Sequence, residues 1–344
     1  MKNIKHLFNV LLFCMVLSPA LTFAQDFFVG VNAHLYAKKE SDISSSINKI
    51  KAIGFSSVRI DVPWKVVEKK RGVYEIPSNW DFMVDYALKN GLSVLLILDY
   101  GNKLYDNGDK PTSNNAVAGF RNYVDFVTKH FEGRVQYYQI WNEWNSRDGD
   151  TKPGSVADYK KLVKAVYPII KKNDNHSLVI TSSFSPAAFN KAIGIENKGD
   201  YLKDYLSKDM SIYTDALSIH PYTTYRKPPF DRFDFYTKQI DYAMNLVQGN
   251  KYFKDKPVFI TEIGWTTAKS RYGVSYDEQA INIKKAICEA KARGYAGVYI
   301  YDFKDDGTNQ ADPEQGFGVL NNNMTMKKSA EVIEKYDCSK SHSH

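Results

Sequence analysis

The chain has 344 residues, of which 43% are hydrophobic, 14% aromatic and 25% charged. This composition can bury a large core, and it excludes an intrinsically disordered chain or a collagen-like repeat. The formal net charge of +7 is small, and the lysines are interspersed with acidic residues, so we expect no nucleic-acid partner.

The first 24 residues have the pattern of a secretory signal peptide. Two lysines precede an apolar run over residues 7–17, and the segment ends in small residues at Ala24. The run is too short for a comfortable membrane span, and the bulky residue before Cys14 argues against a lipid anchor there. We therefore expect residues 1–24 to be removed, leaving a secreted or periplasmic protein with no membrane association.

One pattern recurs along residues 25–338: an apolar or β-branched run, a polar loop and an amphipathic stretch. The apolar runs begin near Phe27, Ser57, Ser93, Gln136, Leu178, Ala216, Pro257 and Ala296. Each interval accommodates one strand, one helix and two loops. The runs are apolar almost throughout, as is typical of parallel strands that are covered on both faces.

The amphipathic stretches predict the helices and their ends. Isoleucines at positions 43, 47 and 50 mark one apolar face, which Gly54 ends. In the next stretch, Asn79 is expected to be the N-cap, and Gly91 to stop the helix.

Eight evenly spaced βα units favour a single-domain α/β fold, a closed (β/α)8 TIM barrel over residues 25–338. An open doubly wound sheet would need a glycine-rich phosphate loop after the first strand, and the sequence at 30–34, GVNAH, has none. Residues 339–344 are expected to form a flexible tail. In such a barrel the reactive side chains lie at the carboxyl ends of the strands.

Cys288 and Cys338 are the only cysteines outside the leader. In an oxidising compartment they either form a disulfide or remain as two buried thiols, and the sequence leaves both alternatives open. Neither has metal-ligand spacing, and the seven histidines are dispersed. We expect no metal, no cofactor and a monomer.

Two glutamates follow nearly opposite strands of the predicted ring. Glu143 ends the fourth strand and Glu262 the seventh, so both side chains can reach one central cavity. Two carboxyl groups that flank a bond are the minimal apparatus for glycoside hydrolysis. The tryptophans around Glu143 would keep that carboxyl protonated, whereas Arg59 and the Tyr222 hydroxyl would keep Glu262 ionised.

The segments IWNEWN (140–145), SIHPY (218–222) and ITEIGW (260–265) resemble the clan of retaining (β/α)8 glycoside hydrolases that carry the acid/base on strand four and the nucleophile on strand seven. The resemblance covers residues 27–330. Within the clan, the segments at 97–106 and 316–330 are most similar to family 39-type and family 5-type glycosidases. They are especially similar to the secreted or periplasmic endoglycosidases that accompany bacterial exopolysaccharide synthesis.

The resemblance implies a role for each residue that matches the motifs. Glu143 would be the general acid/base and Glu262 the nucleophile, Asn142 would hold the 2-hydroxyl of the sugar, and Arg59 and Tyr222 would orient Glu262. The further candidates for substrate binding are His220, which would support the cavity wall, and His34, Asp99, Trp64, Trp144, Trp265, Tyr301 and Phe303.

Two departures from the family pattern concern sugar contacts. Trp144 stands where proline commonly follows the acid/base, and Tyr301 and Phe303 stand where many relatives carry a tryptophan platform. Trp64 and Trp265 follow strand ends and are expected to line the cleft, because apolar sugar faces pack on aromatic rings.

The favoured function is a retaining endo-glycosidase that cleaves β-linked polysaccharide, with a bacterial exopolysaccharide as substrate. Endo action is inferred because no loop at the barrel mouth looks long enough to form a lid or pocket wall. The alternatives are an endo-β-mannanase, cellulase or β-xylosidase of the same clan, or a non-catalytic carbohydrate-binding barrel. A phosphate-handling barrel enzyme is disfavoured, because two aspartates follow Lys304 after the eighth strand.

Overall fold

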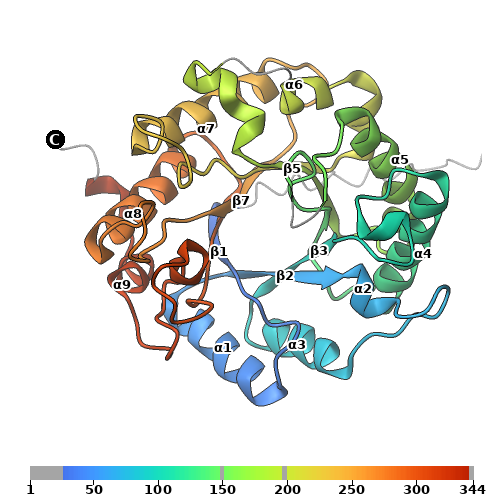
Figure 1. Ribbon diagram of the computed structural model, residues 1–344, viewed down its shortest axis with the longest axis horizontal. Helices are drawn as coiled ribbons and strands as arrows, with labels where there is room; N and C mark the ends of the chain where they lie inside the picture. Colours follow the sequence, from blue (N-terminus) through green and yellow to red (C-terminus); the bar gives the residue numbers. More distant parts are fainter. Residues whose placement is uncertain (1–25, 148–150, 196–199, 341–344) are drawn as a thin grey trace, which may run out of the picture.

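Eight parallel strands pair in sequence order and close into a barrel in the computed structural model, which describes residues 26–147, 151–195 and 200–340 (Figure 1). The strands are β1 (Phe28–Asn32), β2 (Ser57–Pro63), β3 (Ser93–Asp99), β4 (Tyr137–Ile140), β5 (Leu178–Phe184), β6 (Ala216–Ile219), β7 (Val258–Ile263) and β8 (Gly297–Ile300). Since β1 pairs with both β2 and β8, the sheet has no edge. The predicted (β/α)8 barrel is confirmed, and every strand begins within one residue of its predicted start.

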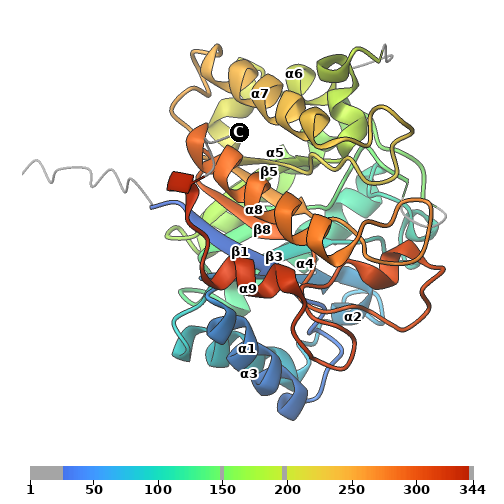
Figure 2. The same ribbon diagram turned by 90° about the vertical axis from the view of Figure 1, so that its left-hand side faces the viewer.

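Helices surround the strands as an outer layer (Figures 1 and 2). They are α1 (Glu40–Ile53), α2 (Trp64–Val67), α3 (Ser78–Lys89), α4 (Asn114–His130), α5 (Val156–Asn173), α6 (Tyr201–Tyr205), α7 (Phe233–Gln248), α8 (Tyr276–Ala292) and α9 (Lys328–Glu334). Short 3-10 segments are η1 (Asp106–Gly108), η2 (Pro186–Ile193), η3 (Lys208–Tyr213), η4 (Pro313–Gly316) and η5 (Cys338–Lys340). Within the described ranges, none of the helices combines the length and apolar character that crossing a bilayer requires.

The helix ends follow the predicted signals with one exception. Gly54 caps α1 in the left-handed conformation, with a φ of 98° that glycine adopts without steric cost. The prediction that Asn79 is the N-cap of α3 is wrong, since the helix already includes Ser78. The Asn79 amide instead donates to the backbone oxygens of Tyr36 and Lys38, and so ties α3 to the loop after β1.

An aromatic layer inside the ring fills the barrel. Phe28 of β1 contacts Tyr299 edge-to-face at 5.6 Å between ring centroids and Phe259 at 6.0 Å. Gly30 is needed at this level, because a Cβ there would lie 2.5 Å from the Tyr299 ring. With the interior packed in this way, the barrel leaves room for a site only beyond the strand ends.

Cys288 of α8 and Cys338 after α9 form a disulfide that closes a separation of 50 residues. Of the two alternatives that the sequence left open, the structure has the paired one. The bond fixes the C-terminal segment against α8, which Figure 2 shows beside α9. Ser339 therefore belongs to a short 3-10 segment rather than to a free tail, while residues 341–344 and the predicted leader 1–24 lie outside the described residues.

A buried ion pair stabilises the long connection between β8 and α9. Lys327 Nζ lies 2.7 Å from Asp305 Oδ1, and the two side chains are 0% and 6% exposed. Breaking such a pair leaves an uncompensated buried charge, so Lys327→Met should lower the free energy of unfolding by about 3–5 kcal/mol.

Denaturant titration of Lys327→Met beside Lys328→Met checks this prediction. Lys328 pairs with Asp277 at the surface, where the two side chains are 61% and 64% exposed, so its replacement should leave stability nearly unchanged. If Lys327→Met and Lys328→Met unfolded at the same denaturant concentration, the buried ion pair would contribute no more to the free energy of unfolding than the exposed one.

Candidate active site

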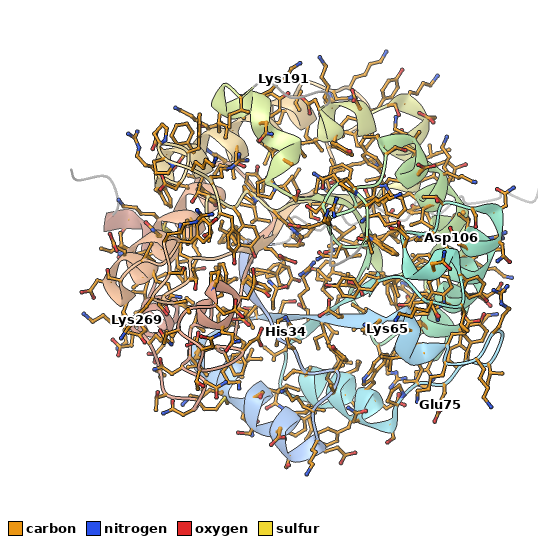
Figure 3. All side chains as sticks on the ribbon, in the orientation of Figure 1. His34, Lys65, Glu75, Asp106, Lys191 and Lys269 are labelled. Atoms are coloured by element: carbon orange, nitrogen blue, oxygen red, sulfur yellow. A yellow bond between two sulfur atoms is a disulfide. The ribbon has the colours of Figure 1, made fainter. Side chains whose placement is uncertain are left out.

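A cavity of about 500 Å³ opens at the carboxyl ends of the strands. In Figure 3 the labelled His34 lies beside the centre of the ring, whereas Lys191 and Lys269 lie at its periphery. The predicted site residues that line this cavity are His34, Arg59, Asn142, Glu143, Tyr222, Glu262 and Tyr301. They come from six different strands or the loops that follow them, so only the closed barrel brings them together.

The two glutamates face one another across the cavity. One carboxylate oxygen of Glu143 lies within 4.8 Å of one of Glu262. Trp141 and Glu143, two residues apart, have positive φ values of 64° and 44°. This left-handed conformation costs about 1–3 kcal/mol per residue. Backbone hydrogen bonds from Trp141 to Leu98 and from Glu143 to Ser183 hold this turn, which places the Glu143 side chain in the cavity.

Glu262 is held as an anion by two neighbours that the sequence had pointed to. Arg59 Nη1 donates to Oε1 at 2.7 Å, and the Tyr222 hydroxyl donates to Oε2 at 3.1 Å. Burial alone would raise the pKa of Glu262, but the charges of His220 and Arg59 and the two hydrogen bonds outweigh it and hold the pKa below its ordinary value.

The Arg59 guanidinium is itself fixed by neutral side chains. Nε donates to Gln139 Oε1 at 3.0 Å, Nη2 donates to Asn142 Oδ1 at 2.8 Å, and Nη1 also contacts Asn32 Oδ1. Because its Oδ1 accepts from Arg59, the Asn142 amide presents its NH2 group as the donor for a ligand.

Gln139 and Asn32 were not among the predicted site residues. A polar residue inside the apolar run YYQI is the signal that could have identified Gln139. Asn32 ends β1, where its Nδ2 donates to the backbone oxygens of Thr261 and Ile300 and thereby ties neighbouring strands together.

His220 lies behind the cavity wall and bridges the two glutamates. Its Nδ1 is 3.0 Å from Glu143 Oε1 and 3.7 Å from Glu262 Oε2, and its Nε2 is 2.8 Å from Thr261 Oγ1. A proton on Nδ1 lets the ring donate to Glu143, while Nε2 lies within hydrogen-bond distance of the Thr261 hydroxyl. The ring therefore positions the Glu143 carboxyl.

One wall of the cavity carries a protonated histidine among acids. His34 Nδ1 lies 3.0 Å from Asp306 Oδ1 and 3.9 Å from Asp302 Oδ2. Burial would lower the pKa of His34, but the Asp306 hydrogen bond and the charges of Asp302, Asp306 and Asp61 raise it to about 9. Asp61 also lines the cavity, although it was not among the predicted site residues.

Two clusters in the described part of the chain combine side chains that can ligate metals. They are His34 with Asp302 and Asp306, and His220 with Glu143 and Glu262. In the first, the imidazole is protonated at neutral pH and so is not available as a ligand. In the second, the glutamates are engaged by His220, Arg59 and Tyr222. We assign a metal to neither cluster.

The long β8–α9 connection forms part of the cavity wall, which contradicts an expectation from the sequence. It contributes Tyr301, Glu314 and Phe317 to the lining. The Tyr225 hydroxyl donates to Glu314 and links this connection to the loop after β6. The view that no barrel-mouth loop is long enough to form a wall is therefore wrong.

The tryptophans expected in the cleft belong to the core instead. Trp64 is fully buried, stacks on Tyr105 at 4.7 Å and donates to Glu68 Oε2 at 2.6 Å. Trp144 packs edge-to-face on Trp141 at 5.3 Å, so this pair faces the helices rather than the Glu143 carboxyl.

Three further candidates are also buried away from the lining of the main cavity. Trp265 stacks on Phe233 at 5.9 Å and lines a separate hollow of about 110 Å³ rather than the main cavity, and Phe303 is 3% exposed. Asp99 is fully buried at the end of β3. Large aromatic rings find partners between barrel and helices, which strand position alone does not reveal. Asp99 lies behind Asp61, to which it is hydrogen-bonded and which does line the cavity.

Comparison with known proteins supports the resemblance. Residues 23–305 match the model of the family described as cellulase, glycosyl hydrolase family 5. A beta-galactosidase-1-like protein 3 from Rattus norvegicus is 20% identical over 90% of this chain and 44% of its own, so the chain spans less than half of that curated relative.

Solved structures of glycosidases share the fold. A family 39 glycoside hydrolase from Bacteroides cellulosilyticus WH2 has a TM-score of 0.73 and 24% identity, covering 90% of this chain and 63% of that one. An exo-beta-1,4-mannosidase from Opitutaceae bacterium strain TAV5 has a TM-score of 0.65 and 17% identity, covering 90% and 59%. The resemblance to family 5-type glycosidases is confirmed by the family match, and the family 39 structure shares the fold.

Proposed function

Since the chain belongs to the cellulase family, glycosyl hydrolase family 5, we propose that it hydrolyses β-linked polysaccharide with retention of configuration at the anomeric carbon. The observation that carries the proposal is the facing pair of Glu143 and Glu262, with carboxylate oxygens within 4.8 Å. Retaining glycosidases hold these groups about 5–5.5 Å apart, whereas inverting ones need roughly 6.5–9.5 Å to admit a water molecule.

The contacts assign a role to each carboxyl group. Glu262, kept ionised by Arg59 and Tyr222, attacks the anomeric carbon while Glu143 protonates the departing oxygen. The glycosidic bond breaks and an ester to Glu262 forms. Glu143, now ionised and steadied by His220, then takes a proton from the incoming water, which cleaves the ester and restores both groups.

The finer proposal is endo action on an exopolysaccharide outside the cytoplasm. Beyond Tyr225 and Arg226 the main cavity adjoins a second hollow of about 110 Å³, which suits a chain longer than one sugar. The disulfide and the leader-like N-terminus suit an oxidising compartment. Two structurally similar proteins are described as a beta-xylosidase and an exo-beta-1,4-mannosidase, so the rival to endo action is release of single sugars from chain ends.

A panel of β-linked glucans, mannans and xylans, together with the producer's own extracellular polymer, tests the proposal. Reducing ends should appear with at least one polymer, and they should be absent with the Glu262→Gln variant. Oligosaccharide products support endo action, and monosaccharide as the main product contradicts it. Saturable binding without any new reducing ends would leave a carbohydrate-binding barrel as the function.

The Arg59–Glu262 pair predicts the acid limb of the pH profile. Activity requires ionised Glu262, so it is lost as the pH falls through the pKa of this group, which Arg59 and Tyr222 hold below its ordinary value. Tyr222→Phe should move the acid limb of kcat/KM upward, and Arg59→Gln should move it by about 1–3 pH units. An acid limb that stayed in place in both variants would contradict the assigned contacts.

A further inference from the structure

Arg226 lies in the wall of the catalytic cavity and pairs with no acid. Its Nη2 donates to Pro186 O at 2.7 Å and to Gln239 Oε1 at 3.2 Å, Nη1 donates to Asn190 Oδ1 at 3.0 Å, and Nε donates weakly to Tyr222 O at 3.4 Å. Among residues 26–147, 151–195 and 200–340, no carboxylate forms an ion pair with this guanidinium. All four of its partners are neutral oxygens.

This arrangement differs from that of the other arginine in the cavity. The charge of Arg59 is balanced by Glu262 at 2.7 Å, as is usual for a buried ion. Burial lowers the pKa of Arg226 to about 10, which still leaves the group charged at neutral pH. A guanidinium has five N–H donors, and the four contacts leave one Nη1 donor without an acceptor in the described chain.

Arg226 lies between two hollows of the barrel mouth. It lines both the main cavity and the hollow of about 110 Å³ beside it. A second arginine, Arg271, lies in the wall of that hollow with its guanidinium over the Tyr272 ring at 4.6 Å. The Tyr225 and Tyr272 rings meet at 4.9 Å there, which provides an aromatic surface for a sugar face.

The charges of the cavity are unevenly distributed. The acids that accompany His34, namely Asp61, Asp302 and Asp306, lie on the wall formed by β1, β2 and β8. The η2 residues that border Arg226 include no acid, and Asp231 is the one acidic residue in the lining of the adjoining hollow. Glu314 of the β8–α9 connection also lines the main cavity, but it accepts from Tyr225 and forms no ion pair with Arg226. Among the described residues of this wall, Arg226 is therefore the positive charge that no carboxylate balances.

We propose that Arg226 recognises a carboxylate on the substrate, so that the polymer is an acidic β-linked polysaccharide with a carboxylated sugar close to the cleaved bond. The inference rests on the proposed function and names its substrate class. The ligand carboxylate supplies the missing counter-charge and accepts from the free Nη1 donor, and Arg271 adds a second positive charge farther along the chain.

One acidic polymer and its carboxyl-reduced form, in which each carboxylate has become a hydroxymethyl group, provide the test. The wild-type protein should cleave the acidic form with a kcat/KM about 10–100-fold higher, as expected for a hydrogen bond to a charged group. Arg226→Gln should lose this preference, because its kcat/KM falls more on the acidic form than on the carboxyl-reduced form. Arg226→Lys should retain part of it, and the preference should shrink as salt is added.

Arg232→Gln is the matched control. Arg232 lies in the same connection between β6 and α7, but it is 65% exposed and already paired with Asp234 at 2.9 Å. Its replacement should leave the ratio of the two kcat/KM values unchanged. The ratio also separates recognition from structure, because an Arg226 that merely tied η2 to α7 would affect both polymers equally.

Four results would overturn the inference, and the last of them would also overturn the proposed function. Equal cleavage of both polymers by the wild-type protein, or an equal loss on both in Arg226→Gln, leaves Arg226 with a structural role only. If neutral glucans or mannans are cleaved in a Glu262-dependent way without any acidic preference, the proposed function stands and this inference fails. If no polymer of either kind yields reducing ends, both fail.

Discussion

Glu262→Gln should reduce kcat by at least about 10⁴-fold on every substrate, whatever its leaving group. The amide has nearly the same shape as the carboxylate but cannot form the ester, so the first step fails for polysaccharides and activated aryl glycosides alike. Release of reducing ends measures activity on polysaccharide, and release of a coloured phenol measures activity on the aryl glycoside.

Loss of fold is the alternative explanation that this variant must exclude. Removing the carboxylate leaves Arg59 buried without its counter-charge, so stability should fall by about 3–5 kcal/mol. Circular dichroism and thermal unfolding show whether the variant remains folded under assay conditions. A folded Glu262→Gln protein with full turnover would contradict the role of Glu262 as the nucleophile.

Glu143→Gln should show an effect that depends on the leaving group. On polysaccharide, whose sugar alcohol leaves only when protonated, kcat should fall by about 10²–10⁴-fold. An aryl glycoside with an acidic phenol needs no proton, so the ester to Glu262 should still form and then accumulate, because no base activates water. A burst of phenol followed by slow turnover is the expected record in stopped-flow assays.

The contrast between Glu262→Gln and Glu143→Gln shows which carboxyl group is the nucleophile and which is the acid/base. Equal losses on polysaccharide and aryl glycoside in Glu143→Gln would contradict its role as acid/base. His220 Nδ1 contacts Glu143 Oε1 at 3.0 Å, so His220→Gln is expected to weaken the proton-transfer step without preventing ester formation.

The strand pattern was predictable because each strand is an apolar run bounded by polar residues. Closure of the ring then decides which strand ends meet. Glu143 and Glu262 follow from this reasoning, and so does Asp306, which lies 272 residues from His34 in sequence but beside it because β8 pairs with β1. Asp306 was nevertheless not among the predicted site residues.

Side-chain direction at the strand ends was less predictable. Arg59 and Asp61 alternate along β2 and line the cavity, but the strand stops at Pro63 and α2 begins with Trp64. Trp64 is in phase with Ile60 and Val62, the residues of β2 that face the helices, so its indole packs on Tyr105 outside the barrel. The expectation that Trp64 lines the cleft considered its place at the strand end but not this alternation.

Loop contacts were beyond sequence reasoning altogether. Arg226 depends on partners 36 and 13 residues away, Asn190 and Gln239, which lie in segments that no periodicity relates. The β8–α9 connection likewise carries Glu314 to Tyr225 across 89 residues. Such contacts follow from the conformations of particular loops, so only the structure identifies the wall that they form.

The anomeric configuration of the first product tests the central claim most directly. Proton NMR of a β-linked oligosaccharide, followed during the first minutes of cleavage and before mutarotation, distinguishes the two outcomes. Attack by Glu262 followed by water predicts the β-anomer as the initial product. The α-anomer would mean a single displacement by water, which the closeness of the two carboxylates does not accommodate.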